Sequence, residues 1–261
     1  MVSILEAIFL AVIQGITEWL PISSSGHLAL AQYYFHIQAS VLFDIILHLG
    51  TLLAVVVYFR QKILDIIQSA LRLDFKSENG SIIPFAILAL IPTAIIGFAF
   101  KDFFESMFQK PALIGAGLVL TGLVLYSTKY LGKKANSPVG LKQALAMGIA
   151  QGIAVAPGIS RSGSTISAGI AAQGQREKVA AFSFLIAVPA VIGAAIFELK
   201  GKAIEAIGIE AIAIGLLVSF AVGYASIHVL FKLLKGDKFH WFAYYCWLAG
   251  LTAIAASFLV K

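Results

Sequence analysis

Long apolar runs alternate with short polar segments along the whole chain. A helix that crosses a membrane needs about 17 to 25 mostly apolar residues. Uninterrupted runs of this kind lie at residues 40–59, 83–100, 112–128, 179–199, 209–231 and 241–259. Two other apolar stretches, residues 3–35 and 141–172, are broken near the middle by proline, glycine and serine. Each broken stretch leaves two half-length arms, which predicts a re-entrant helical hairpin.

The two breaks share one sequence pattern. Residues 14–27, QGITEWLPISSSGH, align without a gap with residues 151–164, QGIAVAPGISRSGS, and seven of the 14 positions are identical. Three crossings separate the hairpins, and because three is odd, the second half enters the membrane from the opposite side. We therefore predict an all-α integral membrane protein of one domain, residues 1–261. It has six transmembrane helices plus two re-entrant helical hairpins in an inverted-topology repeat, with repeat one at about 1–130 and repeat two at about 138–261.

Composition supports the membrane interpretation. Hydrophobic residues make up 60% of the chain and charged residues 12%, with a mean hydropathy of +0.93, whereas about 25% of residues in an average soluble protein are charged. The net charge of +6 does not indicate a nucleic-acid partner, because the basic residues lie in short loops between apolar runs. Cys246 is the single cysteine, so the chain cannot form a disulfide within itself. The N-terminus has no Lys or Arg before Arg60, and we expect it to belong to the mature fold.

The basic residues also predict the orientation. One side of the membrane holds 13 of them: Arg60, Lys62, Arg72, Lys76, Lys129, Lys133, Lys134, Lys142, Arg176, Lys178, Lys232, Lys235 and Lys238. The other side holds five: Lys101, Lys110, Lys200, Lys202 and Lys261. The side richer in Lys and Arg is normally cytoplasmic, which places both termini outside. Hairpin one then opens from the outside and hairpin two from the inside, and their tips should meet near the midplane.

The two tips have the features of an anion site. Each tip combines helix breakers with hydroxyl side chains and then begins a short helix, whose N-terminal N–H groups and positive dipole favour phosphate. Arg161 adds a forked, permanently charged donor. An arginine within the membrane costs about 2.5 to 3.5 kcal/mol on insertion scales, so it needs an anionic partner. The ligand, Glu18, or both could be that partner.

Side chains suited to phosphate chemistry gather on hairpin one. Gln14 and Glu18 are four residues apart, so they share one helix face, and three serines and His27 follow at the break. A carboxylate, an imidazole and hydroxyls beside an arginine can cleave a phosphoester or a phosphoanhydride, with either Ser or His as the nucleophile. Serines also cap helices, and for Ser23, Ser25 and Ser164 capping is an equally good interpretation.

Other polar and aromatic residues have plainer interpretations. Asp44 and His48 lie one helical turn apart; we expect Asp44 at the outer membrane interface, and the sequence leaves the role of His48 open. The aromatic run Phe239–Trp247 is typical of an interfacial belt.

The two stretches resemble the signature motifs of a known family. Gln14-x-x-x-Glu18 followed by Pro21-Ile-Ser-Ser-Ser-Gly-His27, and Pro157-Gly-Ile-Ser-Arg-Ser-Gly-Ser-Thr165, are similar to the two motifs of the undecaprenyl-diphosphate phosphatases, also called bacitracin-resistance proteins. The resemblance implies an enzyme of the bacterial inner membrane that removes the terminal phosphate of undecaprenyl diphosphate at the outer face. That reaction recycles the lipid carrier for cell-wall synthesis. The resemblance also implies a divalent cation, Mg²⁺ or Ca²⁺.

The resemblance assigns roles to particular residues. It implies catalytic roles for Glu18, Ser24, His27 and Arg161. It implies further functional positions at Gln14, Ser160, Ser162 and Thr165, which we expect to bind substrate. The neighbouring motif residues Ser23, Ser25, Gly26, Gly163 and Ser164 are additional candidates for substrate binding. Glu18 and Gln14 are the candidate metal ligands, and Gln14 leaves this pair with one carboxylate.

Two other functions fit the same pattern. Inverted repeats with broken helices are also the architecture of secondary transporters, so the chain could carry a small anion or flip an anionic lipid. A structural membrane scaffold is a third interpretation, although it leaves the polar residues unexplained. The sequence also leaves open whether Ser24 or His27 attacks, and whether two copies form a homodimer.

Overall fold

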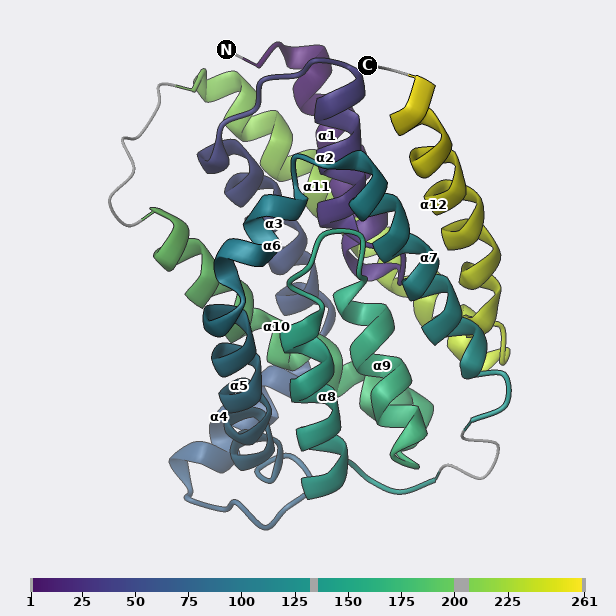
Figure 1. Ribbon diagram of the computed structural model, residues 1–261. Coiled ribbons are helices and arrows are strands. Elements are labelled where there is room, and N and C mark those ends of the chain that lie inside the picture. The colour runs from purple at the N-terminus through teal and green to yellow at the C-terminus, as the bar shows by residue number, and fades with distance from the viewer. Residues whose placement is uncertain (1, 132–135, 200–206, 260–261) are drawn as a thin grey trace.

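The computed structural model describes residues 2–131, 136–199 and 207–259, and these residues form helices with no β-strand among them (Figure 1). The elements are α1 Ile4–Trp19, α2 Ser24–Tyr34, α3 Val41–Tyr58, α4 Arg60–Leu71, α5 Ile82–Ala99, α6 Lys101–Met107, α7 Pro111–Ser127, α8 Leu141–Ile153, α9 Arg161–Ala171, α10 Arg176–Leu199, α11 Ile209–Lys235, the 3₁₀ helix η1 Phe239–Trp241 and α12 Phe242–Leu259. The prediction of an all-α protein is confirmed.

Helices long and apolar enough to cross a membrane correspond to the predicted crossings. They are α3, α5, α10, α11 and the segment Phe239–Leu259. A sixth crossing results if α6 and α7, which are bent by 106° at a short break, count together as one span. The protein is therefore a multi-pass integral membrane protein.

Two helices were missed by the sequence analysis, which treated their residues as loops. The first is α4, whose apolar residues Ile63, Ile66 and Ile67 recur at helical spacing, with Lys62 and Asp65 on the other face. The second, α6, is a single short amphipathic segment before the bend into α7. Both are too short and too polar to register as crossings, and this is why a search for long apolar runs does not find them.

The two broken stretches form the predicted helical hairpins, α1 with α2 and α8 with α9. A capping box between Ser3 and Glu6 begins α1. In Figure 1 the two hairpins extend toward each other from opposite ends of the molecule, and the N and C ends lie together at one end. The inverted orientation within a membrane, and the division into two repeats, stay predictions. Five of the counted basic residues, Lys133, Lys134, Lys200, Lys202 and Lys261, lie outside the described residues.

Each hairpin packs against helices of the other half of the chain. The first arm, α1, lies mainly along α11, and α8 lies along α5, while α7 and α12 pack against each other. Gly50 allows α3 to approach α11 closely, because a Cβ atom there would lie 1.9 Å from the Ser219 Oγ. The halves are thus interlocked around the hairpins.

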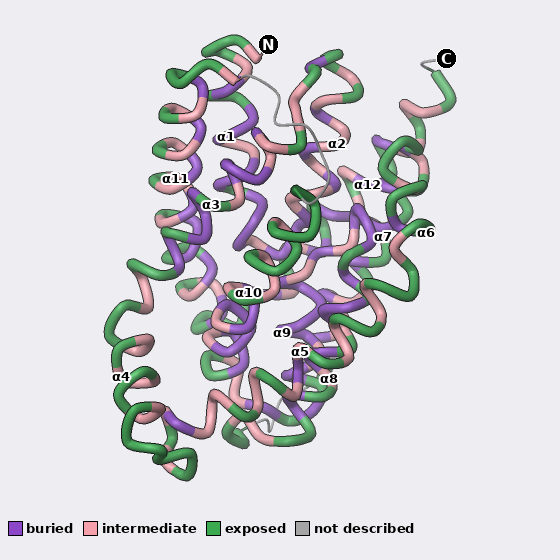
Figure 2. Tube along the Cα trace, turned by 90° about the vertical axis from the view of Figure 1, so that its left-hand side faces the viewer, coloured by how far each residue is buried: buried purple, intermediate pink, exposed green. Residues whose placement is uncertain are grey.

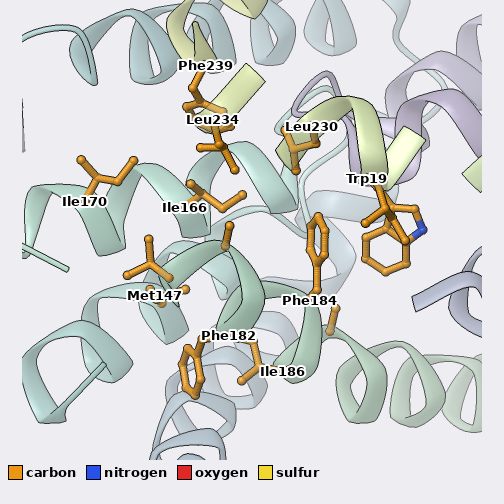
Figure 3. Close-up of a cluster of buried hydrophobic side chains, with 14 of the residues drawn as sticks. Trp19, Met147, Ile166, Ile170, Phe182, Phe184, Ile186, Leu230, Leu234 and Phe239 are labelled. Atoms are coloured by element: carbon orange, nitrogen blue, oxygen red, sulfur yellow. The ribbon is translucent and has the colours of Figure 1, made fainter. Parts of the chain in front are cut away.

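Buried residues occupy the centre of the molecule (Figure 2). Many large apolar side chains are exposed on its outside. Figure 3 shows the larger core cluster, in which Trp19 lies beside Phe184 with ring centroids 4.9 Å apart. On the outer surface Ile95 is 63% exposed and Leu248 69% exposed. Such wide apolar exposure suits contact with lipid tails rather than water.

The close approach of α3 and α11 gives a stability prediction. Gly50→Ala forces the two helices apart and should cost about 1 to 3 kcal/mol, which is typical of an overpacked core. Gly193→Ala is the matched control, because nothing lies within 4 Å of a Cβ at that position. Thermal unfolding in detergent should show a lower melting temperature for Gly50→Ala and no decrease for Gly193→Ala. Equal melting temperatures would contradict the packing.

Candidate functional site

The tip of hairpin one is a strained turn that directs Ser24 back toward α1. Ser23 has a φ of 69° and caps α2, and its side chain accepts a hydrogen bond from the Gly26 N–H at 3.3 Å. A positive φ is uncommon for a residue other than glycine, and such strain often marks functional sites. Because α2 begins at Ser24, the first hydroxyl of the helix faces Glu18 near the end of α1.

The tip of hairpin two is fixed by α7. Gly158 has a φ of 86°, and the Ser160 side chain caps α9 by accepting from the Gly163 N–H at 3.1 Å. Thr121 of α7 donates to the Gly158 carbonyl at 2.9 Å and accepts from the Ser160 N–H at 3.0 Å. One hydroxyl therefore satisfies two backbone groups at the break. This geometry sets the start of α9, whose first residue is Arg161.

The two tips meet, as the sequence predicts. A Cβ atom on Gly26 would lie 2.9 Å from the Gly158 Cα, so the two hairpins touch backbone to backbone. A Cβ atom on Gly163 would lie 3.2 Å from the Cβ of Pro21. The Ser162 hydroxyl also donates to the Leu20 carbonyl at 3.3 Å.

Glu18 is the centre of the polar contacts between the tips. Its side chain accepts from the Arg161 Nη2 at 2.5 Å on one oxygen. The other oxygen accepts from the Ser24 hydroxyl at 2.6 Å and from the Gln14 amide at 3.0 Å. His48 Nε2 lies 3.6 Å from that oxygen. Glu18 is only 7% exposed, so its charge depends on these partners.

Arg161 has a second, unused set of donors. Its guanidinium lies over the Trp19 ring at 4.8 Å, which is a cation–π distance. Its buried Nη1 has no hydrogen-bond partner among the described residues. A buried, unpartnered donor is rare in folded proteins, and on an arginine it can bind an oxygen of an incoming anion.

Both hairpins line one cavity of about 30 Å³, a volume sufficient for about two water molecules. The residues that line it are Thr17, Glu18, Ser23, Ser24 and Ser25 from hairpin one, and Ala154, Ile159, Ser160 and Arg161 from hairpin two. Hydroxyls, one carboxylate and one guanidinium thus surround a single space. The first turns of α2 and α9 also line it.

Comparison with known proteins agrees with this arrangement. The family model "Bacitracin resistance protein BacA" matches residues 7–252. The chain belongs to this family. Among curated relatives, the "Undecaprenyl-diphosphatase" of Syntrophotalea carbinolica is 43% identical over 95% of this chain and 97% of its own length. The protein of the same name from Korarchaeum cryptofilum is 38% identical over 97% of this chain and 98% of its own length. That from Rubrobacter xylanophilus is 36% identical over the full length of both chains, 100% of each.

In this BacA-family protein, six of the predicted site residues line the cavity: Glu18, Ser23, Ser24, Ser25, Ser160 and Arg161. Gln14 joins them through its hydrogen bond to Glu18. Gly26 and Gly163 lie at the contact between the tips, where they permit close packing. Ser162 bonds the backbone of hairpin one, and the Ser164 N–H bonds the Ser160 carbonyl within α9.

Two predicted residues point elsewhere. Thr165 lies against α10, with its hydroxyl 2.6 Å from that of Ser183. His27 is turned toward α12, where its Nε2 lies 2.8 Å from the Tyr245 hydroxyl. Neither residue lines the cavity. Position in the motif placed both on the correct hairpin, but the direction of a side chain depends on the neighbouring helix.

The sequence analysis missed residues that support the site from outside the motifs. Thr121 holds hairpin two, Trp19 lies under Arg161, and Tyr245 contacts His27. His48, left open, lies beside Glu18. Asp44, expected at the interface, accepts from the Gln32 amide at 3.0 Å and is only partly exposed. A polar residue within a long apolar run was the signal for Thr121 and His48; nothing in the sequence marked Tyr245 among its aromatic neighbours.

The residues at the site can hold a divalent cation only together with oxygen atoms of the bound substrate. The described part of the chain holds no cluster of three His, Cys, Asp or Glu side chains suited to a metal. Gln14 donates from Nε2 to the Glu18 carboxylate at 3.0 Å, and its buried Oε1 has no hydrogen-bond partner in the described part of the chain. Mg²⁺ is commonly held by one or two carboxylates together with phosphate oxygens and water, and Gln14 with Glu18 could supply the protein's share.

The ion pair between the hairpins gives a prediction. Glu18→Gln leaves Arg161 buried without its counter-charge and should destabilise the protein by about 3 to 5 kcal/mol. Heating in detergent with a thiol-reactive dye would follow unfolding through Cys246, which is fully buried. Glu105→Gln is the control, because it makes the same change in the exposed pair with Lys101 and should leave the melting temperature unchanged. An unchanged melting temperature for Glu18→Gln would contradict the assigned role of the pair.

Proposed function

We propose that this protein hydrolyses undecaprenyl diphosphate to undecaprenyl phosphate and inorganic phosphate, and so recycles the lipid carrier for cell-wall synthesis. The observation that carries the proposal is the cavity between the hairpins, where Ser24 donates to Glu18 and the Arg161 Nη1 has no hydrogen-bond partner among the described residues. The name shared by the relatives supports the choice of substrate. The membrane location suits a substrate with a long apolar tail, which lies among the lipid-facing helices while its head group reaches the cavity.

Ser24 is the proposed nucleophile. Its hydroxyl lines the cavity and already donates to the Glu18 carboxylate at 2.6 Å, so Glu18 can take its proton as Oγ attacks the terminal phosphorus. The bond between phosphorus and the bridging oxygen breaks, and undecaprenyl phosphate leaves. Water then hydrolyses the phosphoserine and releases phosphate. His27 does not line the cavity, which favours Ser24 over His27 for the attack.

Binding of the head group requires the polar contacts to rearrange. Arg161 is paired with Glu18 before substrate binds, so phosphate oxygens compete with the carboxylate for the guanidinium. Arg161 can bind them through Nη1, and the N-terminal ends of α2 and α9 add backbone N–H groups and dipoles of the correct sign. Release of Glu18 from Arg161 leaves the carboxylate free to act as the base.

A divalent cation, Mg²⁺ or Ca²⁺, belongs to the proposal. Gln14 and Glu18 would hold it together with oxygens of the diphosphate, where it would neutralise charge on the leaving group. The buried and unpartnered Gln14 Oε1 supports this assignment.

The proposed orientation follows the basic residues. With 13 of them on one side and five on the other, hairpin one opens to the outer face of the cell membrane, both termini lie outside, and the two halves form an inverted repeat. The diphosphate then reaches Ser24 from the outside. The opposed directions of the hairpins in Figure 1 support this arrangement.

Phosphate release from purified protein tests the function. Wild type should release phosphate from undecaprenyl diphosphate, and Ser24→Ala should lower kcat about 1,000-fold or more because the nucleophile is lost. His27→Gln should retain measurable activity. Ser257→Ala is the control, because its hydroxyl bonds only its own helix, at Ile254. Activity in Ser24→Ala with none in His27→Gln would assign the attack to His27 instead.

Sealed vesicles separate the enzyme from a transporter. Movement of the lipid or of an anion across the vesicle membrane, without any release of phosphate by wild type, would replace the proposed function with transport.

Removal of metal tests the cation. A chelator should reduce phosphate release to background. Added Mg²⁺ or Ca²⁺ should restore it, because the cation again neutralises negative charge on the diphosphate. The melting temperature without substrate should not change on chelation, since the protein alone offers one carboxylate at the site. Full activity in excess chelator would remove the cation from the proposal.

A further inference from the structure

Both ring nitrogens of His27 have hydrogen-bond partners. The Nδ1 atom lies 2.8 Å from the backbone carbonyl of Ser23, the strained residue of the turn. The Nε2 atom lies 2.8 Å from the hydroxyl of Tyr245. The two rings are stacked, with centroids 5.6 Å apart and an angle of 15° between their planes. His27 therefore bridges the tip of hairpin one and α12.

These partners determine which nitrogen carries the proton. A carbonyl oxygen can only accept, so Nδ1 must donate its N–H to Ser23. In the neutral ring Nε2 is then the acceptor, and the Tyr245 hydroxyl donates to it. If His27 gains a proton, the same hydroxyl can accept from Nε2. Tyr245 thus keeps its bond in either state, and the Nδ1–H bond to Ser23 persists.

The bond to Ser23 matters because of where that residue lies. Ser23 has a φ of 69°, and this turn sets the first residue of α2, Ser24, against Glu18. A conformation of this kind persists only where surrounding contacts hold it. The His27 Nδ1–H is one such contact, and the bond from Tyr245 to Nε2 holds the ring in the orientation that makes it.

The Tyr245 side chain is 44% exposed, and its backbone is held by the packing of α12 against α7. Gly115 and Gly250 let α7 and α12 approach closely, since a Cβ on Gly115 would lie 2.7 Å from the Gly250 carbonyl oxygen. The next residue along, Cys246, has its Sγ 3.7 Å from the carbonyl of Pro21 in the same hairpin tip. Hairpin one is therefore braced by α12 at two successive residues.

We propose that Tyr245 is a positioning residue for the hydrolysis. It acts through His27, whose ring orientation it fixes by a hydrogen bond and by stacking, and His27 in turn holds the Ser23 turn that presents Ser24 to Glu18. This inference rests on the proposed function, in which Ser24 attacks. It gives His27 a positioning role in place of the catalytic role that the family resemblance implied.

The first test reads the tautomer directly. In protein labelled with ¹⁵N-histidine, the ring nitrogen signals of His27 are assigned by their loss in His27→Gln, among the five histidines of the chain. Wild type should show His27 with the proton on Nδ1. In Tyr245→Phe the lone pair on Nε2 loses its donor, so the Nε2 signal should move toward the position of an unbonded imidazole acceptor nitrogen. Wild-type His27 with its proton on Nε2 would overturn the proposal without any variant.

The second test measures catalysis in the same variants. Tyr245→Phe should lower kcat about tenfold, the effect of losing one neutral hydrogen bond, and should leave KM within about twofold because Arg161 is untouched. Tyr244→Phe is the matched control: it is the adjacent residue, exposed, with its ring against Tyr126 and Trp247. It should keep the wild-type kcat and the wild-type His27 signals.

The outcomes separate this proposal from the proposed function. A wild type that releases no phosphate refutes the hydrolysis. An active wild type whose kcat survives in Tyr245→Phe refutes the positioning role, whatever the His27 signals do. A loss of kcat with unchanged His27 signals also refutes it, because the effect would not pass through His27.

Discussion

The structure depends on one ion pair between two hairpins. Glu18 and Arg161 are separated by 143 positions in sequence, yet their side chains meet at 2.5 Å in a largely buried setting. Removing two charges from water is costly, and only good geometry with additional hydrogen bonds offsets that cost. Gln14, Ser24 and the Trp19 ring supply those contacts. Each hairpin consequently completes the polar environment of the other.

The helices around the hairpins convert this pairing into a defined geometry. Thr121 fixes the backbone of hairpin two from α7, while α12 braces hairpin one through Tyr245 and Cys246. Because α7 and α12 also pack against each other, one helix pair positions both tips. Gly26 and Gly158 then allow the tips to touch without side chains between them. A displacement of either helix would move the nucleophile relative to the arginine.

The same features support the proposed chemistry. In the proposed mechanism phosphate binds, in surroundings of low dielectric, to the N-terminal ends of two helices and to Arg161, whose Nη1 has no hydrogen-bond partner among the described residues. The carboxylate that neutralises Arg161 before substrate binds also accepts the Ser24 hydroxyl. In the proposed mechanism, a phosphate that displaces the carboxylate from Arg161 thereby frees the base. One side chain, Glu18, would then both compensate the charge of Arg161 in the resting protein and activate Ser24.

The sequence by itself determined the membrane class, the crossings, both hairpins and most of the cavity, because apolar length and helix breakers act locally and polar residues within apolar runs are conspicuous. It also carried the family motifs. Only the tertiary structure decided which way His27 and Thr165 point, and that Thr121 and Tyr245 support the tips. Those partners come from helices distant in the chain; Tyr245 is 218 positions from His27. Their contacts depend on how the helices pack, which no local pattern encodes.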